Sequence, residues 1–135
     1  MEVKARLKNL RLAPRKVRLV ADLIRGKKVI EAENILNFTI KRGAKPILKL
    51  LNSVVFNAKH NFGLEKENLY IKKITVDEGQ KFKKLFPRAR GRADTIQRKS
   101  SHVTIVLDEI KTPTQKEQST EEGGRGKLRF PRVGK

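Results

Sequence analysis

The chain has 135 residues, and its 33 Lys and Arg against 14 Asp and Glu give a formal net charge of +19 at pH 7. Self-repulsion at this density opposes compaction, so we expect a polyanionic partner, either a nucleic acid or an anionic membrane. A membrane is the weaker choice, because no run approaches the roughly 20 apolar residues of a spanning helix and the first residues lack a signal-peptide core. The absence of cysteine excludes disulfides and thiol-based metal or redox sites and fits a reducing cytosol.

Composition divides the chain near residue 110. Residues 1–110 hold 26 basic and 11 acidic residues and all the clear periodic patterns, and their length suits one globular domain with one modest core. Residues 111–135 hold 7 basic and 3 acidic residues among Gly, Pro and polar side chains. We expect this basic C-terminal extension to be disordered on its own, with residues 125–135 able to order along RNA.

The first half of the chain predicts a strand followed by helices. Residues 2–8 alternate between apolar and basic side chains, which is typical of a half-buried strand. A helix is predicted from about Pro14, because proline suits a first helical turn, and Gly26 ends it. Its apolar stripe consists of Val17, Val20, Ala21 and Ile24, widened by Leu19 and Leu23.

Two more helices are predicted before the second half of the chain begins. A short one spans residues 29–38, and a longer one runs from about Ala44 to His60. The apolar positions of the longer helix follow the helical spacing closely, so we expect it to be the central core helix; they are Ile47, Leu50, Leu51, Val54 and Ala58. Residues 61–68 are predicted to form a loop.

Two strands are predicted at residues 69–77 and 101–108. Tyr70, Ile74 and Val76 share one parity in the first, and Val103, Ile105 and Leu107 do so in the second. Strands before and after a block of helices, with the last two joined as a hairpin, indicate an α+β fold.

The segment between these strands carries the strongest functional signal. It contains a single acid, Asp94, between residues 81 and 99, and too few apolar side chains to bury itself. An extended arm of about a dozen residues reaches roughly 35–40 Å beyond the domain, with Gly79 expected to act as a hinge. Such a projection needs a foreign polyanionic surface, and we predict RNA contacts from Lys81, Lys83, Lys84, Arg88, Arg90, Arg92, Arg98 and Lys99.

Two further groups have alternative interpretations. The basic residues of the first helix form either a solvated face or a second RNA contact, and the overall charge favours RNA; they are Arg15, Lys16, Arg18 and Arg25. Phe82 and Phe86 either stack on bases or pack between the hairpin arms.

Enzyme signals are weak throughout the sequence. His60 and His102 are far apart, without metal-ligand spacing around them, so a polar strand or helix-end role is expected. Asp77 and Glu78 are adjacent in a strand and therefore point to opposite faces. The glycines at 123–126 lack the full phosphate-loop pattern. We expect no catalytic residue, no metal and no cofactor.

A helix–turn–helix reading of residues 14–38 is disfavoured. Its second helix would carry Glu31 and Glu33 near the end that should present donors to a DNA groove. Acids at this position are ordinary favourable charges at a helix N-terminus.

Several motifs together resemble one family. PRKVRLVADLIRGK (14–27), NAKHNFGL (57–64), LYIKKITVDEG (69–79), FPRARGRAD (86–94) and SSHVTIVL (100–107) are similar to the bacterial large-subunit ribosomal proteins of the L-twenty-two family, in order over residues 1–109. The resemblance implies three helices packed on a small three-stranded antiparallel sheet, with a long protruding basic β-hairpin at about 78–99 and a flexible tail. Residues 1–110 would then be the rRNA-binding domain.

The resemblance also implies partners and a location. The protein would lie in the cytoplasm within the large ribosomal subunit, bind its 23S-type rRNA and neighbouring ribosomal proteins, and support assembly; neither a membrane nor a homo-oligomer is expected. The hairpin tip would face the nascent peptide in the exit tunnel, through Phe86, Pro87, Arg88, Ala89, Arg90, Gly91, Arg92 and Ala93. A free-standing RNA chaperone or nucleoid-type protein with the same basic surface is the competing class.

Overall fold

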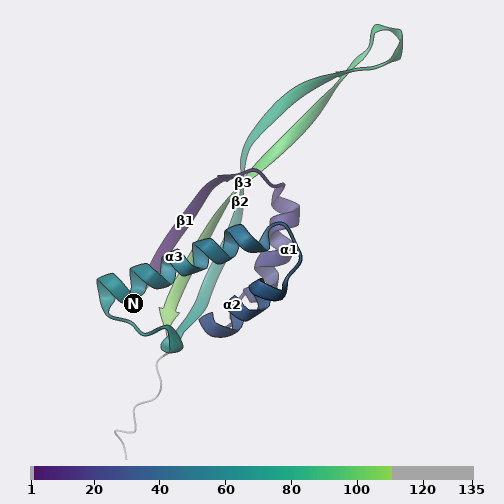
Figure 1. Cartoon of the computed structure of the whole chain (residues 1–135). Helices are drawn as coiled ribbons and strands as arrows, with labels where there is room; N and C mark the ends of the chain where they lie inside the picture. Colours follow the sequence, from purple (N-terminus) through teal and green to yellow (C-terminus); the bar gives the residue numbers. More distant parts are fainter. Residues whose placement is uncertain (1, 111–135) are drawn as a thin grey trace, which may run out of the picture.

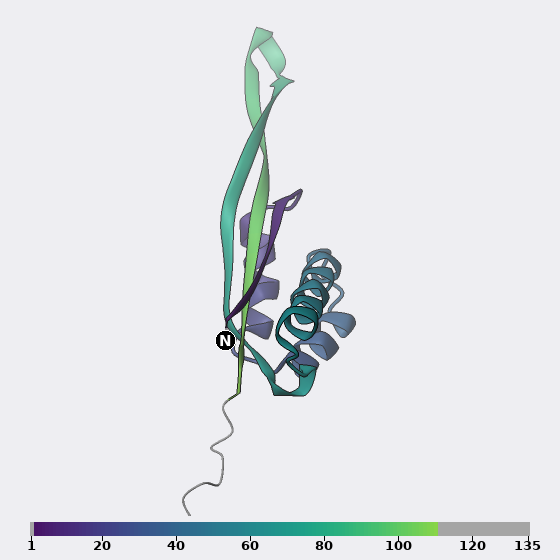
Figure 2. The same cartoon turned by 90° about the vertical axis from the view of Figure 1, so that its left-hand side faces the viewer.

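The computed structural model describes residues 2–110, and it has a helical layer packed on one face of an antiparallel sheet (Figures 1 and 2). The strands are ordered β1-β3-β2. In chain order the elements are β1 (Val3–Leu10), α1 (Pro14–Ile24), α2 (Val29–Phe38), α3 (Ala44–Phe62), the short 3-10 helix η1 (Lys66–Asn68), β2 (Leu69–Pro87), the 3-10 turn η2 (Ala89–Gly91) and β3 (Ala93–Glu109). The α+β prediction is confirmed. The predicted disordered extension, 111–135, lies outside the described residues.

The core forms where the apolar stripes of the helices meet the inner face of the sheet. Val103, Ile105 and Leu107 of the central strand are fully buried, as are Ile47 and Leu51 of α3. The predicted stripe of α1 is also buried, but Leu19 and Leu23 are 57% and 45% exposed. Their predicted part in the core is wrong, because both side chains lie outside the buried stripe and face solvent.

A β-bulge in β2 changes which side chains face the core. The pairing with β3 shifts between Ile71 and Lys73, so Lys72 is the extra residue. Leu69 and Ile71 are buried before the bulge, and Ile74 and Val76 after it. The prediction that Tyr70 shares their face is therefore wrong, since strict alternation does not hold across a bulge.

The ends of two elements also differ from the prediction. Helix α3 extends two residues past His60, to Phe62, and the Gly63 N–H then bonds the Lys59 carbonyl at 3.1 Å. The predicted loop is correspondingly shorter and contains η1. Strand β1 continues to Leu10 through a register shift, at which Asn9 adopts a φ of 56°.

Strands β2 and β3 continue beyond the domain as one long hairpin (Figure 1). The pairing runs out to Pro87 opposite Ala93, with a second bulge between Glu78 and Lys81 where the hairpin leaves the sheet. A Cβ at Gly79 would lie 2.6 Å from Ser100 Oγ, so a larger residue would force Ser100 or the strand to shift there. Every residue from 80 to 99 is exposed.

Candidate nucleic-acid interface

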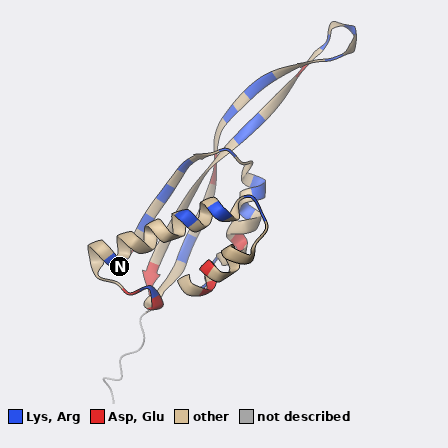
Figure 3. Ribbon diagram, viewed as in Figure 1, with Lys and Arg blue, Asp and Glu red and all other residues tan. Residues whose placement is uncertain are grey.

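Lys and Arg residues lie along both arms of the hairpin (Figure 3), and the fold leaves all of them exposed. Lys81 lies directly opposite Lys99, an arrangement of like charges that destabilises a strand pair. Within the described range, no ion pair holds Lys83, Lys84, Arg98 or Lys99. The structure thus concentrates positive charge on an element that contributes nothing to the core.

The two faces of the hairpin differ in composition. The register places Phe82 opposite Arg98, Lys84 opposite Ile96 and Phe86 opposite Asp94, and facing residues share a side. The exposed apolar residues Phe82, Ile96 and Phe86 therefore lie on one face. Phe82 remains 61% and Phe86 48% exposed. Packing between the arms buries neither ring, which favours the base-stacking interpretation.

The tip is a short turn with a partly organised set of arginines. The Arg88 N–H bonds the Arg92 carbonyl at 2.8 Å, and Arg90 and Gly91 both have left-handed backbone, with φ of 58° and 67°. Arg88 donates to Asp94 at 2.9 Å and lies 5.3 Å from the centre of the Phe86 ring. Arg90 and Arg92 have no acidic partner in the described part of the chain.

At the base of the hairpin, cations from three elements, α1, β2 and β3, gather around one carboxylate. Lys81 lies 2.8 Å from Glu78 and lowers the pKa of that carboxyl, with smaller contributions from Lys99 and Arg18. Arg18 of α1 also donates through Nε and Nη2 to the Val76 carbonyl, at 3.4 and 3.3 Å. The structure therefore brings Arg18 together with the hairpin residues and ties α1 to β2.

The remaining basic residues of α1 are divided between its two ends. Arg15 and Lys16 are exposed in the first turn, which contains no acid. Cations are unfavourable at this positive end of the helix dipole, so their presence favours an anionic partner. The last turn of α1 lies away from the hairpin base (Figure 1). Arg25 follows this turn and pairs with Asp22 at 3.0 Å. Arg25 therefore does not lie with the other three basic residues of the predicted group, Arg15, Lys16 and Arg18.

The open face of the sheet is a basic surface that the sequence prediction did not include. Pairing with β3 places Lys4 and Lys73 on either side of Val106, and Arg6 beside Thr104. A second group, Lys45 and Lys49 of α3, lines a groove of about 480 Å³ together with Arg6. The alternation of residues 4, 6 and 8 was visible in the sequence, but the pairing that adds Lys73 depended on the bulge at Lys72.

Neither histidine has the surroundings of a catalytic or metal-binding residue. His102 Nδ1 accepts a hydrogen bond from the Asn9 N–H at 3.0 Å, which fixes the irregular end of β1. His60 lies near the end of α3, where its Nδ1 is 3.4 Å from Asn61 Oδ1. Residues 2–110 contain no cluster of three metal-ligating side chains. No helix in the same range has the length and apolar character needed to cross a membrane.

The acids of α2 take part in local ion pairs rather than facing a groove. Lys27 lies 2.5 Å from Glu31, and Lys66 pairs with Glu33. The same helix packs against α3. These contacts agree with the argument against a helix–turn–helix DNA reader.

Comparison with known proteins gives one consistent result. Residues 5–108 match the family model of ribosomal protein L22p/L17e. The chain is 51% identical over 109 residues to large ribosomal subunit protein uL22 of Thermus thermophilus, covering 81% of this chain and 96% of the relative. It is 48% identical over 119 residues to uL22 of Onion yellows phytoplasma, covering 86% and 92%, and 50% identical over 109 residues to uL22 of a Thermoanaerobacter species, covering 81% and 98%.

Proposed function

The chain belongs to the ribosomal protein L22p/L17e family, and from this premise we propose that it binds large-subunit rRNA, supports subunit assembly and places its hairpin tip in the wall of the nascent-peptide exit tunnel. Family membership confirms the resemblance predicted from the sequence. A ribosomal protein of this family is a structural constituent of the ribosome and not an enzyme. The proposed partners are the large-subunit rRNA, neighbouring ribosomal proteins and the nascent peptide, in the cytoplasm.

One observation carries the rRNA-binding proposal. The paired strands extend from residue 80 to residue 99 with every residue exposed, while the core lies entirely in the other part of the fold. A free two-stranded ribbon of this kind is only marginally stable, and its facing lysines repel each other. RNA packed on both sides would neutralise the charge with its phosphates and cover the apolar side chains with its sugars and bases. These side chains, all exposed, are Phe82, Leu85, Phe86 and Ile96.

The position of the tip at the far end of this ribbon supports the proposed placement at the tunnel. A hairpin enclosed by rRNA along its arms exposes its turn to whatever space lies beyond the RNA. The turn from Phe86 to Ala93 has mixed apolar and basic character, which is compatible with a wall along which varied peptides pass. The tip residues are therefore proposed to face the nascent chain.

A combined substitution of the tip arginines tests the RNA contact. Arg88→Ala, Arg90→Ala and Arg92→Ala together should weaken binding to large-subunit rRNA while cooperative unfolding stays unchanged, because these exposed side chains interact only within the tip. Affinity is measured by filter binding and unfolding by circular dichroism. The matched control removes the same charge from exposed sites in the helical layer, through Lys41→Ala, Arg42→Ala and Lys59→Ala.

Equal losses of rRNA affinity in the two triple variants would contradict a specific role of the tip.

Sedimentation separates the proposal from a free-standing RNA chaperone. A ribosomal constituent remains on the large subunit in stoichiometric amount through a moderate salt wash. A chaperone would be present in substoichiometric amount and would be released by the wash.

A further inference from the structure

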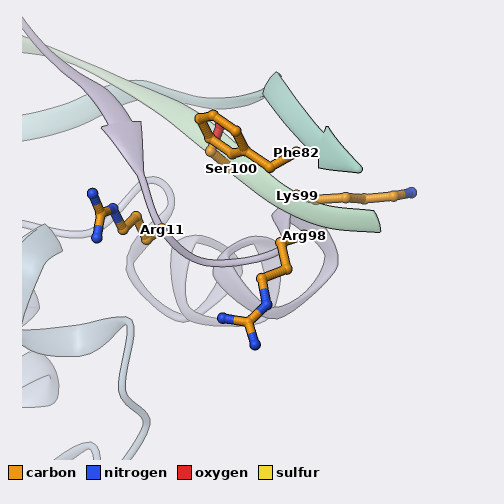
Figure 4. Close-up of a pocket in the computed structure, with 5 residues that line it drawn as sticks. All are labelled: Arg11, Phe82, Arg98, Lys99 and Ser100. Carbon is orange, nitrogen blue, oxygen red and sulfur yellow. The ribbon is translucent and has the colours of Figure 1, made fainter. Parts of the chain in front are cut away.

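A hollow at the base of the hairpin, here called the basal notch, has a volume of about 320 Å³ and is lined by Arg11, Phe82, Arg98, Lys99 and Ser100. Arg11 comes from the turn after β1, whereas the other residues come from β2 and β3 (Figure 4). Its volume is near the lower limit of small-ligand pockets, about 300–1,000 Å³. The notch is therefore large enough for one nucleotide and too small for a helix or a duplex.

The notch offers an aromatic face that the core does not use. Phe82 is 61% exposed and shares a side of the hairpin with Arg98, its register partner. In Figure 4 the Phe82 ring lies over Ser100, while Lys99 projects to the opposite side from Arg11 and Arg98. Ser100 is 3% exposed, and its Oγ donates to the Gln80 carbonyl at 2.8 Å. This bond fixes the bulge beside the ring.

The two arginines of the notch have no ion-pair partner within residues 2–110. Lys99, which also lines the notch, has no ion pair in this range either, whereas Lys81 pairs with Glu78 and Arg88 with Asp94. A guanidinium group binds phosphate oxygens bidentately, and an aromatic ring stacks on an unpaired base. A duplex backbone would provide the phosphates but no base face, leaving the ring uncovered.

We propose that the basal notch holds one unstacked nucleotide of the rRNA, with its base on the Phe82 ring and its phosphates at Arg11 and Arg98. The inference rests on the proposed rRNA binding and adds a base-stacking subsite to an interface made mainly of phosphate contacts. It also assigns a binding role to Arg11, which lies outside the hairpin.

Substitutions of Phe82 in the full chain separate stacking from simple apolar contact. Phe82→Leu keeps an apolar side chain but removes the aromatic face, and it should lower the affinity for transcribed large-subunit rRNA by roughly 5- to 150-fold. Phe82→Tyr should retain the wild-type affinity. Phe56→Leu is the matched control, because Phe56 is 76% exposed on α3, away from the hairpin. Arg11→Gln and Arg98→Gln should each reduce the slope of log affinity against log salt by about 0.7–0.9.

Ultraviolet crosslinking of the wild-type complex, read by mass spectrometry, should join Phe82 to one nucleotide of the rRNA. Wild-type affinity of Phe82→Leu together with no crosslink at Phe82 would overturn the notch and leave rRNA binding intact. Failure of the wild-type chain to bind rRNA would refute both the notch and the proposed function.

Discussion

Gly79 shows how a single missing side chain positions the hairpin. A Cβ there would meet Ser100 Oγ at 2.6 Å and the His102 ring at 3.3 Å. Gly79→Ala should therefore destabilise the fold by about 1–3 kcal/mol, as overpacking does. The cost should be smaller in a Ser100→Ala background, which removes the closest atom. Urea unfolding of the four chains in this cycle measures the difference, and additive effects would contradict the steric account.

The carboxyl of Asp108 makes the stability of the folded chain depend on pH in the acid range. Lys72 bonds Asp108 at 2.8 Å and lies 2.8 Å from Glu2, and its hydrogen bond is the largest cause that lowers the pKa of Asp108 from 3.8 to about 2. Because the pKa is lower in the folded state, the stabilisation is present above about pH 4 and is lost as pH falls toward 2.

Lys72→Met should return the pKa of Asp108 toward its ordinary value and reduce this loss of stability in acid. Nuclear magnetic resonance titration of the Asp108 carboxyl measures the shift. An unchanged titration curve in the variant would show that Lys72 is not the cause.

Helix α3 is the element that the core depends on most. Leu51 is fully buried in it, whereas Phe56 on the same helix is 76% exposed. Leu51→Ala should destabilise the protein by about 2–5 kcal/mol, and Phe56→Ala should change stability by less than about 0.5 kcal/mol. Thermal unfolding compares the two variants. Equal stability of both would contradict the packing of α3 on the sheet.

Regular elements were predictable because their signals are local. The spacing of Ile47, Leu51 and Val54 indicated α3, and alternation in residues 103–107 indicated β3. The positions of the two bulges were not predictable, since they depend on the pairing of β2 with β3, and they decide where Tyr70 and Lys73 point. The notch was missed for a similar reason, because Arg11 meets the hairpin only through the fold.

The whole molecule combines a small apolar core with a large excess of positive charge, +19 in total. If about 8–12 phosphates are neutralised, log affinity for rRNA should fall against log salt with a slope of roughly −6 to −11, using ~0.7–0.9 per contact. Filter binding over a series of salt concentrations gives the slope. A flat response would contradict an interface based on phosphate contacts.

The enclosure of the hairpin by rRNA is tested most directly by a density map of large subunits that contain this chain, compared with subunits that contain a shortened hairpin. Deleting Lys83 and Lys84 together with their partners Ile96 and Gln97 removes two facing pairs, so the remaining side chains keep their faces. We predict rRNA on both sides of residues 80–99, a tip at the tunnel wall, and its withdrawal by about 7 Å in the shortened chain. A hairpin lying in solvent, or a tunnel of unchanged width after the deletion, would contradict the account.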